Sequence, residues 1–345
     1  GPERRSRTGL SFPLRGRPTV AVITPDKEPV LIVPARERVK AEANSIGARI
    51  FAYGEDLEAR RVAFVQAAES IGLGRRRVGV EPLRMRWLEE RLLEETAPGV
   101  RWASAEALLE PLRVEKSGDE IHAIEHAVAI AEAALGETLP HVRAGMTELE
   151  LASELTLQLL RAGSVGELPF QPIIASGPNA ALPHAVPTAR PLGRGDLLIV
   201  DWGATFDGYS SDLTRTFALE SIEPEWKRIQ AVVVDANAAG RAAAGPGVAC
   251  QTLDAAARSV IEASGYGPAF LHRTGHGIGM AAHEPPYLRS DNLARLTPGM
   301  TFTVEPGIYL AGRGGVRVED TLVITGEGAR TLSTLPRPLQ ILPLG

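Results

Sequence analysis

The stretch that decides the fold is LLIVDWGATFDGYSSDLTRT, residues 197–216. Its first four residues are apolar, which is typical of a buried strand that runs into Asp201. A glycine-containing turn follows, and residues 213–219 are expected to form a second strand. The pattern therefore predicts an antiparallel hairpin with Asp201 on its first strand and Asp212 on its second. Two carboxylates that face each other in an apolar setting repel unless a cation or a proton neutralises them, which indicates a metal site.

The same aspartates could also be ordinary turn or capping residues, so the interpretation depends on what else the chain supplies. The chain has 345 residues, 44% of them apolar and 23% charged, which predicts an ordinary globular protein of about two domains. A net charge of −5 gives no reason to expect nucleic acid or an anionic membrane as a partner.

Three features of the chain concern its compartment. Cys250 is the only cysteine, which fits a reducing compartment. The start, Gly1 to Arg7, is basic without an apolar core behind it, unlike a secretory signal. No apolar run approaches the length of a membrane span. These features predict a cytoplasmic protein.

Strand and helix patterns alternate up to about Arg113, which predicts an α/β domain without a catalytic constellation of its own. A short polar linker is expected near residues 114–119, followed by a strongly helical segment over residues 120–135. His122 and His126 lie one turn apart on that segment, but they lack the metalloprotease pattern and are interpreted as surface residues.

The second informative stretch is HRTGHGIGMAAHEPPY, residues 272–287, which contains three of the seven histidines. Glycines on both sides of His276 allow the backbone to approach a site closely. Its alternating glycines do not form a dinucleotide fingerprint that opens a helix, so nucleotide binding is not expected.

Two glutamates lie in strand-like apolar runs near the end of the sequence: Glu305 in TFTVEPGIY, residues 301–309, and Glu319 in GVRVEDT, residues 315–321. They could face water on edge strands, but a glutamate in such a context is rarely left unpaired. With Asp201, Asp212 and His276 they form a set too rich in oxygen for one tetrahedral zinc. The set suits two divalent ions that activate water, with manganese or cobalt favoured.

These motifs, in this order, resemble the creatinase/aminopeptidase family of dinuclear metallopeptidases, and specifically its Xaa-Pro peptidases (prolidase and aminopeptidase P). The matching elements are the two aspartates eleven residues apart, RTGHGIG, HEPP, VEPG and RVED. The resemblance implies an α+β fold, with a pita-bread catalytic domain over residues 115–345 and a smaller α/β domain over residues 1–114.

The resemblance also implies roles at the metal centre. Asp201 would bind one ion, Asp212 and Glu319 would bridge two ions, and His276 and Glu305 would complete the second site. The ions would be manganese, with cobalt or zinc as alternatives, and would hold a bridging hydroxide as the nucleophile. Glu305 would pass its proton to the leaving proline nitrogen.

Further residues would form the substrate site by the same resemblance. His184 and His283 would hydrogen-bond the scissile carbonyl and the developing oxyanion. His272 would line the pocket for the proline ring. Arg317 would belong to the substrate site and orient Glu319.

The activity implied is an Xaa-Pro dipeptidase that acts on small peptides with proline in second position, as a homodimer. The alternatives are an aminopeptidase P acting on longer peptides, or an inactive pita-bread binding module. The position where some prolidases carry an arginine for the substrate carboxylate is Tyr287 here, with Arg289 two residues on. The choice between dipeptidase and aminopeptidase therefore stays open at the level of sequence.

Overall fold

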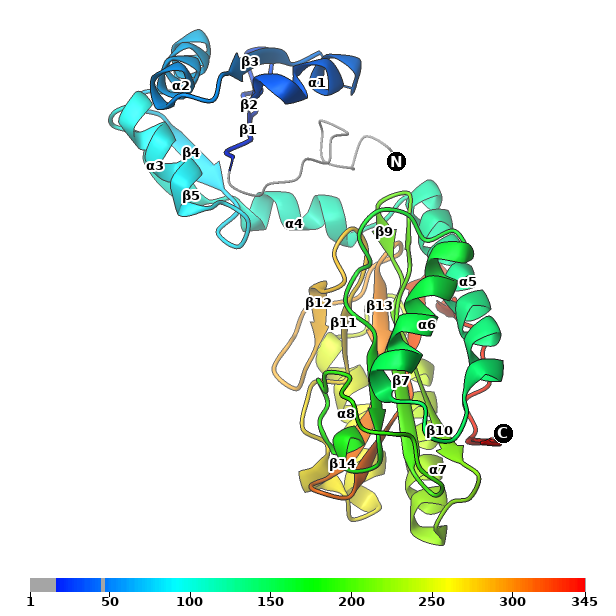
Figure 1. The fold of residues 1–345 in the computed structure, drawn as a ribbon. Helices are drawn as coiled ribbons and strands as arrows, with labels where there is room; N and C mark the ends of the chain where they lie inside the picture. Colours follow the sequence, from blue (N-terminus) through cyan, green and yellow to red (C-terminus); the bar gives the residue numbers. More distant parts are fainter. Residues whose placement is uncertain (1–16, 45–46, 345) are drawn as a thin grey trace. The chain divides into compact units, whose positions relative to one another are not determined.

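The protein is described by a computed structural model over residues 17–44 and 47–344, so the basic start, Gly1 to Arg7, lies outside the described residues. The chain forms two compact units that divide between Leu112 and Arg113 (Figure 1). No helix within the described ranges is both long and apolar enough to span a membrane.

The first unit alternates strands and helices, as the sequence predicts. β2 pairs antiparallel with β1 and parallel with β3, and β4 pairs parallel with β5. Helix α2 begins after Asp56, whose side chain accepts a hydrogen bond from the Ala59 N–H. The strands are β1 (Val20–Val22), β2 (Val30–Pro34), β3 (Arg49–Tyr53), β4 (Arg77–Val80) and β5 (Arg101–Ser104), and the helices are α1 (Arg38–Asn44), α2 (Leu57–Ile71), α3 (Trp87–Thr96) and α4 (Glu106–Val114).

Four long helices belong to the second unit: α5 (Gly118–Thr138), α6 (Glu148–Arg161), α7 (Pro224–Ala242) and α8 (Cys250–Ala263). The expected capping box of Thr147 and Glu150 is confirmed at the start of α6. A second capping box, Ser117 with Glu120, starts α5, so the helix begins inside the segment expected to be a linker. On α5, the His126 ring stacks on Phe206 at 4.9 Å between centroids.

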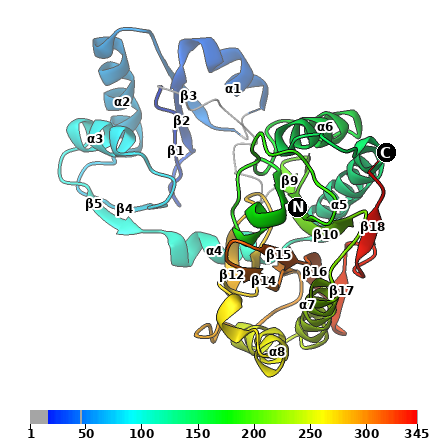
Figure 2. The same cartoon turned by 60° about the horizontal axis from the view of Figure 1, so that its bottom comes forward.

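The strands of the second unit form two main sheets. One has the order β18-β10-β7-β6 and the other β12-β11-β13-β16-β17, with two further strand pairs, β14–β15 and β8–β9. Helices α5 and α6 lie on one side of the strands and α7 and α8 on the other (Figure 2). The bounds are β6 (Ile173–Ser176), β7 (Leu197–Trp202), β8 (Thr205–Phe206), β9 (Tyr209–Ser210), β10 (Leu213–Leu219), β11 (Gly275–Gly277), β12 (Glu284–Leu288), β13 (Thr301–Val304), β14 (Gly307–Leu310), β15 (Gly314–Arg317), β16 (Asp320–Ile324), β17 (Ala329–Thr331) and β18 (Gln340–Leu342).

The predicted hairpin is β7 with β10, paired antiparallel with Thr214 opposite Asp201. One detail of the prediction is wrong: Asp212 precedes β10 by one residue rather than lying on it. The chain between β7 and β10 forms the small β8–β9 ribbon, and β10 begins only after Asp212. A side chain at Gly203 would place Cβ 2.0 Å from the Ser211 carbonyl oxygen, so only glycine allows this close approach.

Glu305 and Glu319 lie between strands rather than within the continuous runs that the sequence suggests. β13 ends at Val304 and β14 begins at Gly307, while β15 ends at Arg317 and β16 begins at Asp320. At each break the chain leaves one sheet for another. An isolated bridge between Thr214 and Glu319 joins β10 to this break, so both glutamates lie where sheets meet.

Candidate metal centre

The five predicted metal ligands converge in the second unit. The carboxylate oxygens of Asp201, Asp212 and Glu319 lie within 4.8 Å of one another, as do the ligand atoms of His276, Glu305 and Glu319. A third such group joins Asp212 and His276 to His283. Since the groups share members, they form one continuous cluster.

Burial makes this cluster electrostatically unfavourable without cations. Asp212 and Glu319 are 4% and 1% exposed. Burial, together with the charges of neighbouring carboxylates, raises the pKa of both side chains well above the ordinary range. Oδ1 of Asp201 and Oε1 of Glu319 are buried without a hydrogen-bond partner among the described residues. Unpartnered carboxylate oxygens in a crowded anionic site fit oxygen-ligated divalent cations.

The orientation of His276 leaves one ring nitrogen for a metal. Its Nδ1 lies 3.1 Å from the Gly277 carbonyl, which can only accept a hydrogen bond, so Nδ1 carries the proton. Nε2 faces Glu305 at 3.3 Å and Asp212 at 3.6 Å. Burial, with the nearby His283, lowers the pKa of His276 well below its ordinary value. The imidazole is therefore neutral, as a metal ligand must be.

Glu305 is the carboxylate best suited to proton transfer. Burial is the main cause that raises its pKa to about 7, with Asp201 acting in the same direction and Arg317 opposing. The Thr303 hydroxyl lies 3.3 Å from Oε1 and also accepts the His276 N–H at 3.1 Å. Thr303 thus links the backbone of His276 to the Glu305 carboxylate.

Arg317 is buried and its direct carboxylate partner is Asp201, not Glu319. Its Nη2 donates to Asp201 Oδ2 at 2.5 Å. Its Nε donates to Thr214 Oγ1 at 3.1 Å, and that hydroxyl donates to Glu319 Oε2 at 2.7 Å. Arg317 therefore contacts Glu319 only through Thr214, a residue that the sequence analysis did not single out.

Tyr309 is a further missed residue. Its hydroxyl lies 2.9 Å from His272 Nε2 and accepts from Arg317 Nη1 at 2.8 Å. His272 Nδ1 lies 2.8 Å from the Arg273 carbonyl and therefore carries the proton, so Tyr309 donates to Nε2. Burial, with Arg317 nearby, lowers the pKa of His272 to about 4. His272 is thus neutral, with both ring nitrogens engaged, and offers its ring face.

His184 lies in an exposed loop whose two ends are fastened by Glu148 of α6. The fully buried Glu148 carboxylate accepts from the N–H and hydroxyl of Ser176 at 2.7 and 2.8 Å, and from those of Thr188 at 3.0 and 2.6 Å. Arg317 Nη1 donates to the Pro183 carbonyl at 3.1 Å, next to His184. The loop is therefore held toward the carboxylate cluster.

His283 is exposed, and its ring lies 3.9 Å from the His276 ring between centroids. The ring is only partly enclosed, but this partial desolvation, with Arg273 and His184 nearby, lowers its pKa. It joins the cluster from the segment between β11 and β12.

Arg273 and Arg289 lie on either side of this segment in the sequence, and they differ in their surroundings. Arg289 is exposed and forms an ion pair with Asp291 at 2.8 Å. Arg273 places its guanidinium 4.8 Å from the Tyr287 ring centroid, and its Nε is buried without an acceptor among the described residues. Of these two arginines, Arg273 is therefore the one with a buried N–H donor that lacks an acceptor among the described residues.

Behind Glu319, the neighbouring Asp320 is fully buried and forms an ion-pair network that the sequence did not reveal. It pairs with Arg215 at 2.9 Å and with Arg337 at 2.6 Å. Burial acts to raise the pKa of Asp320, but these arginines outweigh burial and hold the pKa below its usual range. Arg215 also donates to the Glu319 carbonyl at 2.5 Å, which fixes the backbone beside the cluster.

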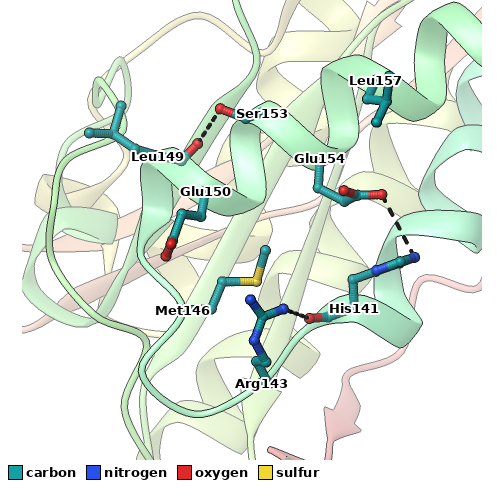
Figure 3. Close-up of a pocket in the computed structure, with 8 residues that line it drawn as sticks. All are labelled: His141, Arg143, Met146, Leu149, Glu150, Ser153, Glu154 and Leu157. Atoms are coloured by element: carbon teal, nitrogen blue, oxygen red, sulfur yellow. Dashed lines mark hydrogen bonds and ion pairs between the residues drawn. The ribbon is translucent and has the colours of Figure 1, made fainter.

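A surface hollow of about 390 Å³ lies beside α6 and shares no residue with the cluster (Figure 3). Two of its polar side chains pair with each other, His141 lying 3.7 Å from Glu154, and the Ser153 hydroxyl donates to the Leu149 backbone carbonyl at 2.8 Å. It holds none of the predicted ligands, so the cluster, not this hollow, is the candidate site.

Comparison with known proteins identifies the class. Residues 122–326 match the model of metallopeptidase family M24, and residues 7–114 match the creatinase/prolidase N-terminal domain. The chain belongs to metallopeptidase family M24. The α+β fold expected from the sequence, a pita-bread unit preceded by a smaller α/β unit, is confirmed.

Three relatives illustrate the range of similarity. An uncharacterized peptidase of Bacillus subtilis, YqhT, is 37% identical over 95% of this chain and 91% of its own length. An Xaa-Pro dipeptidase of Pyrococcus horikoshii is 35% identical over 80% of this chain and 77% of its own. The crystal structure of an X-Pro aminopeptidase from Thermotoga maritima superposes with a TM-score of 0.85 at 30% identity, covering 99% of this chain and 93% of that one.

Proposed function

We propose that this chain is a metal-dependent Xaa-Pro dipeptidase, a prolidase that hydrolyses the bond before proline in dipeptides. The observation that carries the proposal is the buried cluster of four carboxylates and His276, with two carboxylate oxygens left unpartnered. A relative named Xaa-Pro dipeptidase at 35% identity supports the substrate class. Aminopeptidase P activity is the second candidate, favoured by the likeness to an X-Pro aminopeptidase structure.

The proposed ligands are Asp201, Asp212, His276, Glu305 and Glu319, which offer enough donors for two divalent ions. The excess of carboxylate oxygens over nitrogen favours manganese, with cobalt or zinc as alternatives. When bound, such ions activate water and polarise the scissile carbonyl.

The other residues have roles that follow from their surroundings. Glu305, with a pKa near neutrality, takes the proton of the attacking water and delivers it to the proline nitrogen. His184 and His283 donate hydrogen bonds to the carbonyl oxygen as negative charge develops on it. His272, neutral and fixed by Tyr309, presents an apolar ring face to the proline ring.

The organisation of the protein is also proposed. Residues 1–114 and 115–345 are taken as the two domains, and the ranges of the two family models support this boundary. A homodimer is inferred from the family resemblance. A cytoplasmic location is inferred from the single cysteine, Cys250, which is buried and whose pKa burial raises to about 11. Light scattering and cell fractionation test these two inferences.

The decisive experiment compares Ala-Pro, Ala-Pro-Ala and Ala-Ala as substrates, with Mn²⁺ and with chelator. We expect cleavage of Ala-Pro alone, abolished by chelator. Preferential cleavage of Ala-Pro-Ala would make the protein an aminopeptidase P. Equal cleavage of Ala-Ala would contradict proline specificity. No cleavage of any of the three with metal bound would contradict peptidase activity and leave the binding-module alternative.

Replacing Arg317 with methionine is expected to weaken Mn²⁺ binding by about 10–100-fold, because Asp201 and Thr214 lose the donor that orients them. Calorimetric titration of the metal-free protein with Mn²⁺ measures the effect. Arg313→Met removes an exposed arginine that pairs with Glu225 and serves as the control. Equal affinity in the Arg317 and Arg313 variants would show that Arg317 does not support the ligands.

A further inference from the structure

A buried ion pair connects the segment that enters the second unit with the segment that carries His283. Lys116 Nζ lies 2.6 Å from Glu284 Oε1, and the two side chains are 1% and 7% exposed. Nζ also donates to the Val114 carbonyl at 3.3 Å. Removing two charges from water costs several kcal/mol for each ion, so such a pair adds little net stability. The position of this ion pair in the fold is therefore more informative about its role than its contribution to stability.

The Lys116 end of the pair is fixed by the backbone. The Lys116 N–H donates to the Gly299 carbonyl at 2.9 Å, and Glu115 forms a bridge with Met300 at the start of β13. A Cβ at Gly299 would lie 2.7 Å from the Lys116 carbonyl oxygen. Lys116 is thus anchored to the sheet that contains β11 and β13. His276 lies on β11, and β13 ends directly before Glu305.

The Glu284 end closes a loop. Glu284 is the first residue of β12, where the chain that left β11 after Gly277 rejoins the sheet. A Cβ at Gly279 would lie 2.6 Å from Glu284 Oε1 and 2.8 Å from Lys116 Cε, so the pair fills the space beneath residues 279–284. The Gly279 carbonyl accepts the Ser210 N–H at 2.8 Å, which fixes the other end of this loop.

His283 lies in this loop directly before Glu284, between half-buried alanines and the sheet edge. Because the His283 side chain is exposed, its own burial does not fix its position. Glu284, the anchored residue directly after it, fixes the position of His283 instead. We propose that Lys116, through its ion pair with Glu284, is a positioning residue that holds His283 at the candidate metal centre. The inference rests on the proposed function, in which His283 stabilises developing charge.

The test is a double-mutant cycle of Lys116→Met and His283→Ala, measured as kcat and KM on Ala-Pro with saturating Mn²⁺. We expect Lys116→Met to lower kcat at least tenfold with little change in KM, because positioning affects the transition state more than binding. In the His283→Ala background, Lys116→Met should have no further effect. Lys227→Met, which removes an exposed lysine of α7, is the matched control.

An equal loss of kcat in both backgrounds would overturn the proposal, because Lys116 would then act independently of His283. If Lys116→Met alone does not fold, Lys116→Met with Glu284→Met replaces it in the cycle, since this pair leaves no buried charge uncompensated.

Hydrogen exchange of the metal-free protein gives a readout that does not depend on activity. Lys116→Met should speed amide exchange over residues 279–288 at least tenfold relative to Lys227→Met, with other segments unchanged. Unchanged exchange in this loop would contradict the proposal. Failure of the unmodified protein to cleave Ala-Pro would contradict the proposed function, while the exchange result would still decide whether Lys116 holds the loop.

Discussion

Replacing Glu305 with glutamine is expected to lower kcat on an Xaa-Pro dipeptide by about 10²–10⁴-fold, the usual contribution of a positioned general acid–base. Glutamine has nearly the same shape and keeps an oxygen toward the cluster, but it cannot carry a proton. Burial raises the pKa of Glu305 to about 7 in the metal-free protein, and bound cations would lower it, so that the ionised carboxylate is ready to accept a proton. The substitution removes that capacity without leaving a cavity.

Steady-state kinetics with metal content measured on the same samples separate loss of proton transfer from loss of metal. The control is Glu327→Gln, an exposed turn residue outside the cluster. A Glu305→Gln protein that contains its full complement of metal and keeps more than a tenth of the original kcat would contradict the role assigned to Glu305.

Removing the metal is expected to make the stability of the folded protein fall as the pH rises from 6.5 to 8. Asp212, Glu305 and Glu319 have folded-state pKa values above those of free carboxyls, so the folded state binds more protons than the unfolded state in this window. A carboxyl with a raised pKa makes the free energy of unfolding fall as the pH rises. The fall is about 1.4 kcal/mol per pH unit for each group still protonated in the folded state.

The lower limit of this window is set by the histidines. His272, His276 and His283 have lowered pKa values, so below about pH 6.5 they make stability rise with pH and oppose the carboxyls. Above it their opposing contribution fades as they lose their protons in the unfolded state too. Chemical denaturation of the chelated protein at several pH values is expected to show a loss of about 1–3 kcal/mol per pH unit.

Two comparisons make this result specific. Saturation with Mn²⁺ should flatten the pH dependence, because the cations then neutralise the carboxylates. Metal-free Asp212→Asn should be more stable than the metal-free original at pH 8, since asparagine is neutral in both states and needs no proton uptake on folding. Metal-free stability that rises between pH 6.5 and 8 would show that the cluster is not electrostatically strained.

The residues of the candidate metal centre could be singled out from the sequence because they belong to local patterns. The run before Asp201 and the glycines around His276 each indicate a structural context within a few residues. The breaks in the strands at Glu305 and Glu319 were missed, because an apolar alternation does not reveal which sheet each residue joins. Only the pairing partners show that the chain changes sheet at these glutamates.

Residues that support the ligands could not be found from the sequence for a related reason. Thr214, Tyr309 and Lys116 act through partners that are 105, 37 and 168 residues away for the contacts with Glu319, His272 and Glu284. A threonine or tyrosine in a strand is ordinary for its β propensity, so nothing local marks it. Tyr309 becomes identifiable only once its burial is known, because a buried tyrosine hydroxyl usually requires a partner.

The bridge between Thr214 and Glu319 also bears on when the candidate centre forms as the chain folds. The five ligands span residues 201–319 and meet only after separate sheets have joined. A nascent or misassembled chain therefore lacks the complete set of proposed ligands. Metal binding at this centre is thereby coupled to correct assembly of the sheets.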